Sequence, residues 1–297
     1  MKFHLTILIL FLHYSGYLLC QRPISDSTYR KTRLMTIGVG ITSTASIAGL
    51  GTFWYKDLGK NGFKFRNDWR QWYQMDKLGH SYSGYLISDK IYQCYKWTGT
   101  NIDKSLIIGS SIGLGYLLSF EILDGLSNDW GFSWSDIGAN TIGASMFFFQ
   151  QEFWKEQRIR FKFSSSLSPY AKYRPEILGS SIPERLLKDY NGQTYWLSVN
   201  ASSFLKNDSK FPKWLNFSFG YSIDERLNGS QNTYTTSQNL TFKSRREYLF
   251  SLDIDLQKIY TRKVWLRSLL GTLNSIKIPF PTLRYANNGW RLYGIYF

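Results

Sequence analysis

The chain has three histidines, and two of them, His4 and His13, fall in an apolar N-terminal segment. The third, His80, follows Asp76 and Lys77 in a stretch with helical spacing. Asp76 and His80 are four residues apart and should therefore share one face of a helix. An imidazole beside a carboxylate can act as a general base or bind a divalent metal. His80 is the first candidate for chemistry.

Two further apolar stretches also offer paired polar residues. Glu121 and Asp124 are three apart in one, and Asp136 and Asn140 are four apart in the next. Ionisable groups among apolar helices are costly unless they pair or line a wet cavity, so these stripes should converge. The predicted polar site comprises seven residues: Asp76, Lys77, His80, Glu121, Asp124, Asp136 and Asn140.

The predicted site allows two kinds of chemistry. His80, Glu121 and Asp136 are candidate ligands for a divalent metal, or His80 could be a general base oriented by a carboxylate. Ser-His-Asp catalysis and an organic cofactor are not expected. The alternative is structural, in which Asp136 only helps Ser133 to cap a helix and Asp124 only begins a turn before a glycine. His80 would then be a hydrogen-bonded core residue, and whether the chain is an enzyme stays open.

The N-terminus predicts export. Lys2 precedes an apolar run at residues 5–12 that is too short to span a bilayer comfortably, as in a secretory signal peptide over residues 1–20. Cleavage before Gln21 is favoured, and the alternatives are a degraded lipobox that places lipid on Cys20 or an uncleaved anchor. The chain has only two cysteines, Cys20 and Cys94, so no disulfide framework is predicted. Cys94 is expected to be a small core residue.

Residues 21–157 should form a bundle of about four membrane-associated helices. Residues 34–55 carry no charge and several glycines, which fits a span-length helix or one buried in a bundle. Residues 75–97, 104–123 and 135–154 also have helical spacing, the last one after a cap at Ser133. Residues 63–73 combine aromatic and basic side chains, which is typical of a protein surface that contacts lipid headgroups or of the edge of an ordinary hydrophobic core.

From residue 158 onward the pattern alternates with the period of strands. The runs at 195–199, 215–221, 248–256 and 290–297 suit tilted outer-membrane strands of about 9–11 residues, and a helix at 263–276 interrupts them. The predicted class is α+β, a helical bundle followed by an antiparallel β region that could be a small barrel or half-barrel. Spanning helices are normally kept in the inner membrane, so either the helices are buried in a periplasmic bundle or this region is not a barrel.

The basic charge is concentrated in the β region. The chain has a net charge of +15, and residues 158–297 contain 21 Lys/Arg against 9 Asp/Glu, a net +12. Such a surface suits nucleic acid or anionic lipid. No zinc-ligand spacing, basic heptad helix or helix-turn-helix pattern is present, so no nucleic acid is expected. The predicted partner is anionic envelope lipid, and no protein partner can be named.

Three short motifs resemble those of VanZ-like membrane proteins. They are MDKLGH at residues 75–80, EILDG at 121–125 and FSWSDIGAN at 132–140, followed by Gly143. The sequence resembles more closely the uncharacterised YfiM-like family of predicted periplasmic lipoproteins, whose Bacteroidetes members have a similar C-terminal extension. The resemblance covers about residues 30–155 and, more loosely, the tail through DYNGQTYW at 189–196. It implies an envelope location and a helical core, without an established reaction.

These observations predict an exported envelope protein in the outer membrane or periplasm of a Gram-negative bacterium, with the inner membrane as the alternative. The leading hypothesis is a non-enzymatic structural or interaction component. The rival is an enzyme that acts on lipid or cell-wall intermediates at His80, Glu121 and Asp136.

Overall fold

The structure is a computed structural model that describes residues 28–54, 62–206 and 209–297. The predicted signal peptide at residues 1–20, with Cys20, lies outside the described residues. The chain divides into two compact units. Of the described residues, the helical unit contains those from Thr28 to Trp69 together with His80–Glu156, and the sheet unit contains Arg70–Gly79 and Gln157–Phe297. The predicted α+β class, helices followed by an antiparallel sheet, is confirmed.

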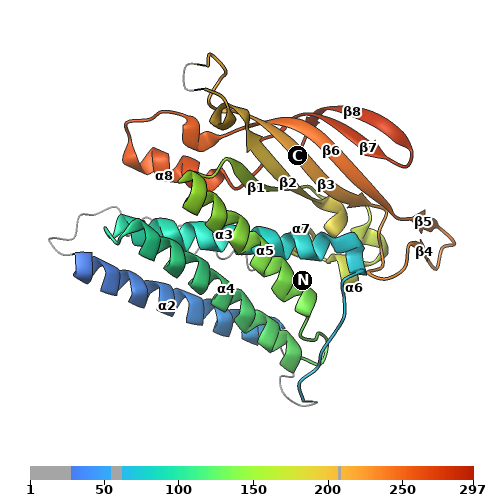
Figure 1. Ribbon diagram of the computed structural model, residues 1–297. Helices are drawn as coiled ribbons and strands as arrows, with labels where there is room; N and C mark the ends of the chain where they lie inside the picture. The colour runs from blue at the N-terminus through green and yellow to red at the C-terminus, as the bar shows by residue number, and fades with distance from the viewer. Residues whose placement is uncertain (1–27, 55–61, 207–208) are drawn as a thin grey trace. The chain divides into compact units, whose positions relative to one another are not determined.

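Long helices make up most of the helical unit (Figure 1). They are α2 (Thr28–Trp54), α3 (Met75–Trp97), α4 (Ile102–Leu126) and α5 (Trp134–Trp154). The first turn of α3, up to Gly79, belongs to the sheet unit. α3 has the predicted bounds, and α4 begins after Asn101, whose side chain accepts from the amides of Asp103 and Lys104. Because Asn101 caps the first turn of α4, the helix begins directly after the predicted turn at residues 98–101.

Glycines let α3 and α4 approach closely. A Cβ built on Gly109 or Gly113 of α4 would lie 2.8 Å from an atom of Ser88 on α3. Small residues at such positions bring helix backbones together. The core beside this contact consists of apolar side chains from both helices, namely Ile87, Ile91, Tyr95, Tyr116 and Leu117. Cys94 is buried, as predicted.

Among the described residues, α4 is the helix long and apolar enough to cross a membrane. It nevertheless buries ten residues within the protein, including Glu121 and Asp124. The helix predicted at residues 34–55 corresponds to α2, described as far as Trp54, and its Met35 and Val39 pack on the core of α3 and α4. Packing within the bundle therefore accounts for part of both apolar runs, and other side chains of α2 and α4, such as Ile41 and Ile107, are exposed.

The aromatic segment before α3 is mostly extended rather than helical. Phe65 forms a bridge with Phe132, and the rings of Phe63, Phe65 and Phe132 pack with centroids 5.2–5.6 Å apart. Trp69 is exposed. The predicted contact of residues 63–73 with lipid headgroups is not tested by these contacts and stays a prediction.

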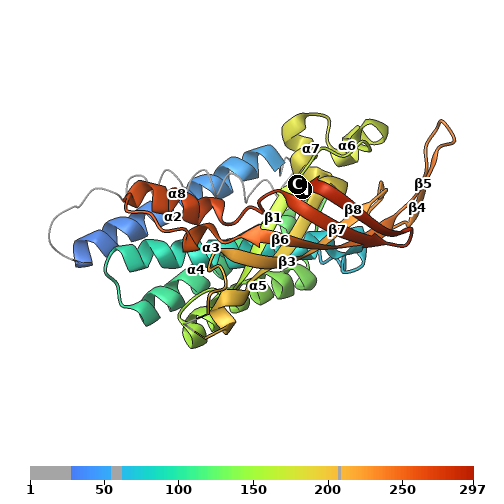
Figure 2. The same cartoon turned by 90° about the horizontal axis from the view of Figure 1, so that it is seen from above.

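The sheet unit is built on a six-stranded antiparallel sheet (Figure 2). In spatial order the strands are β1 (Ile159–Ser165), β2 (Gln193–Asn200), β3 (Leu215–Asp224), β6 (Arg245–Ile254), β7 (Phe280–Ala286) and β8 (Gly289–Tyr296). Four of them, β2, β3, β6 and β8, coincide with the predicted strands. β1 and β7 were not predicted.

Shorter elements connect the strands. A hairpin of β4 (Thr233–Thr235) and β5 (Thr241–Lys243) lies between β3 and β6 in sequence, and α8 (Val264–Leu273) is the predicted helix between β6 and β7. The remaining short helices are η1 (Gln71–Gln74), η2 (Ala171–Tyr173), α6 (Pro175–Leu178), α7 (Ile182–Lys188), η3 (Tyr190–Gly192), η4 (Ala201–Phe204) and η5 (Leu256–Lys258).

The two sides of the sheet differ sharply in polarity. On one side most side chains are polar and buried, among them Lys162, Ser164, Thr194, Ser198, Asn216, Ser218, Ser222, Glu247, Asp253, Thr282 and Arg284. On the other side lies the apolar face, which we define by Leu197, Phe217, Phe219, Tyr248, Phe250, Leu283, Tyr285, Trp290 and Leu292, each at least 38% exposed. A water-facing antiparallel sheet has the opposite arrangement, because it buries its hydrophobic side.

Ion pairs fill the polar side of the sheet. Lys162 Nζ lies 2.7 Å from Asp253 Oδ2, and both side chains are fully buried. Lys162 Nζ also donates to the carbonyl of Ile254 and to Asn274 Oδ1. Lys277 Nζ lies 4.0 Å from Asp253 Oδ1. These buried charges are thus paired and hydrogen-bonded, which burial of charge requires.

The sheet is open but curled. Its strand order ends at β1 and β8, so the described strands do not close into a barrel. The Tyr296 hydroxyl of β8 nevertheless lies 3.1 Å from Thr194 Oγ1 of β2, and the Tyr296 ring packs against Trp196. Of the two forms that the sequence allowed, these strands therefore do not form the closed barrel, and the antiparallel region is an open, curved sheet.

Candidate functional site

His80 lies on α3 between acidic residues of two neighbouring helices. Its Nδ1 atom is 3.7 Å from Glu121 Oε1 of α4, and its Nε2 atom is 3.4 Å from Asp136 Oδ1 of α5. Asn140 Oδ1, one turn beyond Asp136, lies 3.0 Å from Nδ1. We define these four residues as the polar centre. None of them is more than 7% exposed.

Glycines set the distance between α3 and α5 beside His80. A Cβ on Gly143 would lie 1.8 Å from the carbonyl oxygen of Ser81, and a Cβ on Gly84 would lie 2.3 Å from that of Asn140. The Ser81 hydroxyl donates to the carbonyl of Ala139 at 2.9 Å. Because only glycine fits so close to another backbone, these positions bring the imidazole within reach of α5.

The first turn of α5 orients Asp136. Ser133 Oγ accepts from the Asp136 amide at 3.3 Å, which confirms the predicted cap. The hydroxyls of Ser133 and Ser135 both donate to Asp68 Oδ1, at 2.7 and 2.9 Å. No sequence signal pointed to Asp68, because it lies 65 residues before Ser133. Asp136 therefore combines the two roles that the sequence left as alternatives, a position in the helix cap and proximity to His80.

Three of the seven predicted residues are not members of the polar centre. Asp124 is buried one turn beyond Glu121 on α4. Asp76 and Lys77 belong to the sheet unit, where Lys77 Nζ pairs with Asp76 Oδ2 at 2.9 Å. The Tyr190 hydroxyl donates to Asp76 Oδ1 at 3.0 Å in the same unit. Asp76 and Lys77 thus have partners of their own.

The contacts of His80 indicate which ring nitrogen carries the proton. A neutral imidazole donates through one nitrogen and accepts through the other. In the neutral form of His80, a proton on Nδ1 can be donated to Asn140 Oδ1, and Nε2, 3.4 Å from Asp136 Oδ1, then carries the lone pair. Such a nitrogen can accept a proton or bind a metal ion. With all four side chains buried, the polar centre suits a small ligand better than a lipid or a sugar.

The geometry gives no support to a serine nucleophile. Residues 109–113, Gly-Ser-Ser-Ile-Gly, match the letters of a Gly-x-Ser-x-Gly elbow, but they lie in the middle of α4. A nucleophile elbow requires a sharp turn between a strand and a helix.

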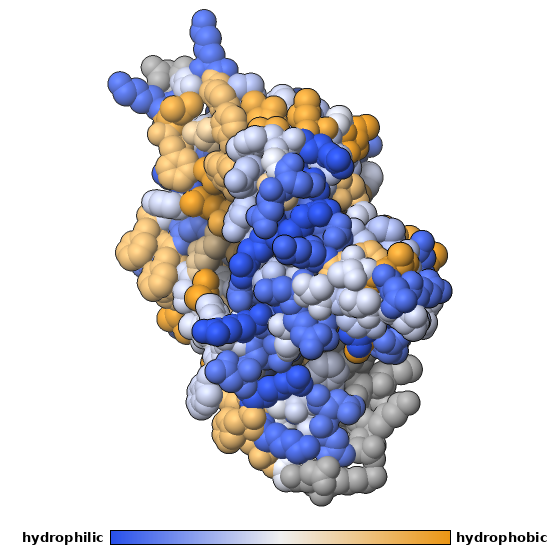
Figure 3. Space-filling view, turned by 90° about the vertical axis from the view of Figure 1, so that its right-hand side faces the viewer, coloured by the Kyte–Doolittle hydropathy of each residue, from blue (hydrophilic) through white to orange (hydrophobic). Residues whose placement is uncertain are grey.

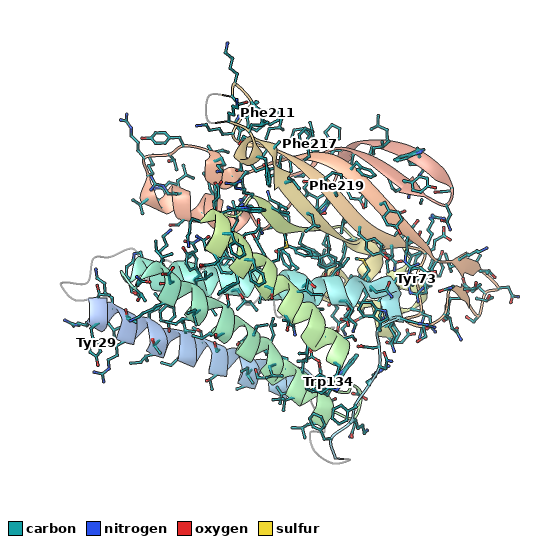
Figure 4. All side chains as sticks on the ribbon, in the orientation of Figure 1. Tyr29, Tyr73, Trp134, Phe211, Phe217 and Phe219 are labelled. Atoms are coloured by element: carbon teal, nitrogen blue, oxygen red, sulfur yellow. The ribbon has the colours of Figure 1, made fainter. Side chains whose placement is uncertain are left out.

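The apolar face of the sheet is a second candidate site. Phe217 and Phe219 follow one another along β3 (Figure 4), and the Phe219 ring packs edge-on against Phe250 with centroids 5.5 Å apart. In Figure 3, hydrophobic side chains gather at the top of the view, where Figure 1 draws the sheet. Large exposed patches of this kind mark contact with a membrane or another protein.

Basic residues gather at one end of this sheet. The β2–β3 and β6–β7 connections leave from the same end, because Leu215 pairs with Ile254. We define the basic end by its exposed residues Lys206, Lys210, Lys213, Arg262, Lys263 and Arg267. The exposed rings of Trp214 and Trp265 lie in the same connections. Mixed aromatic and basic side chains are typical of protein surfaces at lipid headgroups.

A family model described as "Predicted periplasmic lipoprotein (DUF2279)" matches residues 65–152. The matched segment contains the whole polar centre and ends before β1. The match is consistent with the predicted similarity to YfiM-like periplasmic lipoproteins, whereas the similarity to VanZ-like proteins is not shown. The comparisons with curated proteins and with solved structures found no match. The predicted location of an exported protein, in the periplasm or at the outer membrane, is confirmed by the family match.

Proposed function

We propose that the chain is a non-enzymatic interaction component of the cell envelope, held at the outer membrane by its sheet unit. The reversed polarity of the sheet carries this proposal, because polar side chains fill its buried side and the apolar face is exposed. Sheets that meet lipid expose hydrophobic residues in this way. β3 and β6 are each ten residues long, so their hydrophobic side chains form extended rows on the apolar face that can lie against a lipid surface.

Anionic lipid is the partner that this surface fits best. The basic end places six exposed cationic side chains beside exposed tryptophans, next to the apolar face. Each Lys or Arg near an anionic membrane surface contributes about 1 kcal/mol of attraction, which salt screens. Hydrophobic contact would hold the sheet, and the basic end would select anionic headgroups.

Vesicle flotation tests the proposal. The purified full chain is expected to float with phosphatidylglycerol vesicles and more weakly with phosphatidylcholine vesicles, and high salt should narrow the difference. An R262Q/K263Q/R267Q variant should lose the preference for phosphatidylglycerol. A K172Q/K243Q/R291Q variant, which removes the same charge elsewhere in the sheet unit, should keep it.

Two results would contradict the proposal. One is failure of the wild-type chain to float with either kind of vesicle. The other is equal loss of lipid preference in the two charge variants, because total charge rather than the basic end would then explain the binding.

An enzyme acting on lipid or cell-wall intermediates at the polar centre is the second candidate. It is favoured by the position of His80 Nε2 beside the Asp136 carboxylate. Separate substitutions His80→Ala, Glu121→Ala and Asp136→Ala discriminate the two functions. Three folded variants with the wild-type phenotype would exclude the enzyme, whereas a lost phenotype with unchanged vesicle binding would favour it.

A further inference from the structure

We propose that the polar centre binds a divalent transition-metal ion, for which Zn²⁺ is the best match, through His80 Nε2 and the Asp136 carboxylate. This inference concerns the helical unit and goes beyond membrane attachment by the sheet unit.

The spacing of the two ligand atoms is the first argument. His80 Nε2 and Asp136 Oδ1 are 3.4 Å apart. A charge-assisted N–H···O bond is shorter, about 2.7–2.9 Å. Two ligands that each lie about 2.0–2.1 Å from a tetrahedral Zn²⁺ are about 3.3–3.4 Å from one another. The observed separation therefore matches one edge of a zinc tetrahedron.

The surroundings of Nδ1 are the second argument. A histidine that binds metal through one nitrogen usually donates its other N–H to a carboxylate or carbonyl group, which fixes the ring. Asn140 Oδ1 lies 3.0 Å from Nδ1 and is placed to accept this N–H, and Glu121 Oε1, 3.7 Å from Nδ1, attracts the N–H electrostatically. The sequence suggested Glu121 as a direct ligand. Because Nδ1 and Nε2 point away from one another, Glu121 instead orients the imidazole.

The donor set and the scaffold indicate the class of metal. An imidazole favours zinc and its neighbours over calcium and magnesium, which prefer oxygen ligands. One imidazole and one carboxylate leave coordination positions for water or a small anion. The close contacts at Gly84 and Gly143 fix α3 against α5, so both ligands stand on rigid helices.

Metal analysis of the purified full chain tests the inference. After chelation and incubation with Zn²⁺, the wild type should retain about one ion per chain, and Co²⁺ should give the visible absorption of a low-symmetry site. His80→Gln and Asp136→Asn should abolish retention. Glu121→Gln should weaken the affinity by roughly 10–100-fold, as loss of a partner that orients a ligand does. Asp103→Asn, an exposed control on α4, should bind as the wild type does.

Thermal unfolding shows whether a variant that does not bind Zn²⁺ is still folded. Zn²⁺ should raise the Tm of the wild type and of Asp103→Asn, and should leave the Tm of Asp136→Asn unchanged. Absence of Zn²⁺ binding by the wild type, or wild-type binding by Asp136→Asn, would overturn the inference. Either result would leave vesicle binding by the sheet unit unaffected, so the two proposals fail separately.

Discussion

Replacing Phe219 and Phe250 by serine should greatly weaken membrane binding. The two side chains are 50% and 42% exposed and therefore have surface left to bury in lipid. A phenylalanine carries about 150–250 Å² of surface, so about 100 Å² remains at each position. At about 25 cal/mol per Å², each ring contributes about 2 kcal/mol to transfer into hydrocarbon. Losing both should cost about 4 kcal/mol, or roughly a thousandfold in the partition coefficient.

Titration of the F219S/F250S variant with phosphatidylglycerol vesicles measures this change. The fold should be retained, because both rings lie outside the buried side of the sheet, and circular dichroism checks that. Phe153→Ser is the matched control, since Phe153 is 74% exposed but lies on α5 of the helical unit. A loss below tenfold in the double variant, or an equal loss in the control, would refute the role of the apolar face.

Three further predictions concern stability. Gly143→Ala should lower the free energy of unfolding by about 3 kcal/mol in urea denaturation, because the new Cβ would collide with the Ser81 carbonyl. Asp253→Ala should lower it by about 3–5 kcal/mol, because Lys162 would keep a buried charge without its carboxylate. Burial lowers the pKa of Lys277 to about 8, below the value of about 10.4 in the unfolded chain. Between these pH values the unfolded chain binds more protons than the folded chain, so the free energy of unfolding should rise with pH. This lysine should contribute up to about 1.4 kcal/mol per pH unit, which urea denaturation at several pH values measures.

Each stability prediction has a control. Gly115→Ala should change stability by less than about 1 kcal/mol, since a Cβ added at Gly115 would meet nothing within 4 Å. Glu152→Ala should change it by less than about 1 kcal/mol, because its pair with Lys155 is exposed. Lys277→Met should flatten the rise with pH. Equal effects in each variant and its control, or an unchanged pH profile, would contradict the packing and charge assignments.

Local patterns predicted most of the elements. Both ends of α3 were predicted correctly, because helical spacing continues without a break to Trp97. Gly99, with a φ of +87°, belongs to the turn that follows. β3 alternates hydrophobic and polar or small residues along its length, and β6 does so from Phe250 to Ile254. β1 was missed because it is short and puts Lys162 into the interior, where a charge is not expected. β7 was missed because Pro281 interrupts its pattern.

The polar centre shows what helical spacing cannot provide. Spacing tells which residues share a face of one helix, but not which faces of different helices meet. The meeting of His80 with Asp136 depends on backbone contacts at Gly143 that are visible only in three dimensions. Spacing likewise could not show that Asp76 is paired with Lys77 and Tyr190 in the sheet unit.

Contact between the apolar face and lipid is the central claim, and photocrosslinking in intact cells tests it most directly. A photoreactive benzoylphenylalanine would be incorporated at position 219, on the apolar face, and at position 230, in an exposed loop before β4. Mass spectrometry after irradiation should find lipid adducts at position 219 and none at position 230. Adducts at position 219 that contain only protein, with no lipid, would contradict the account.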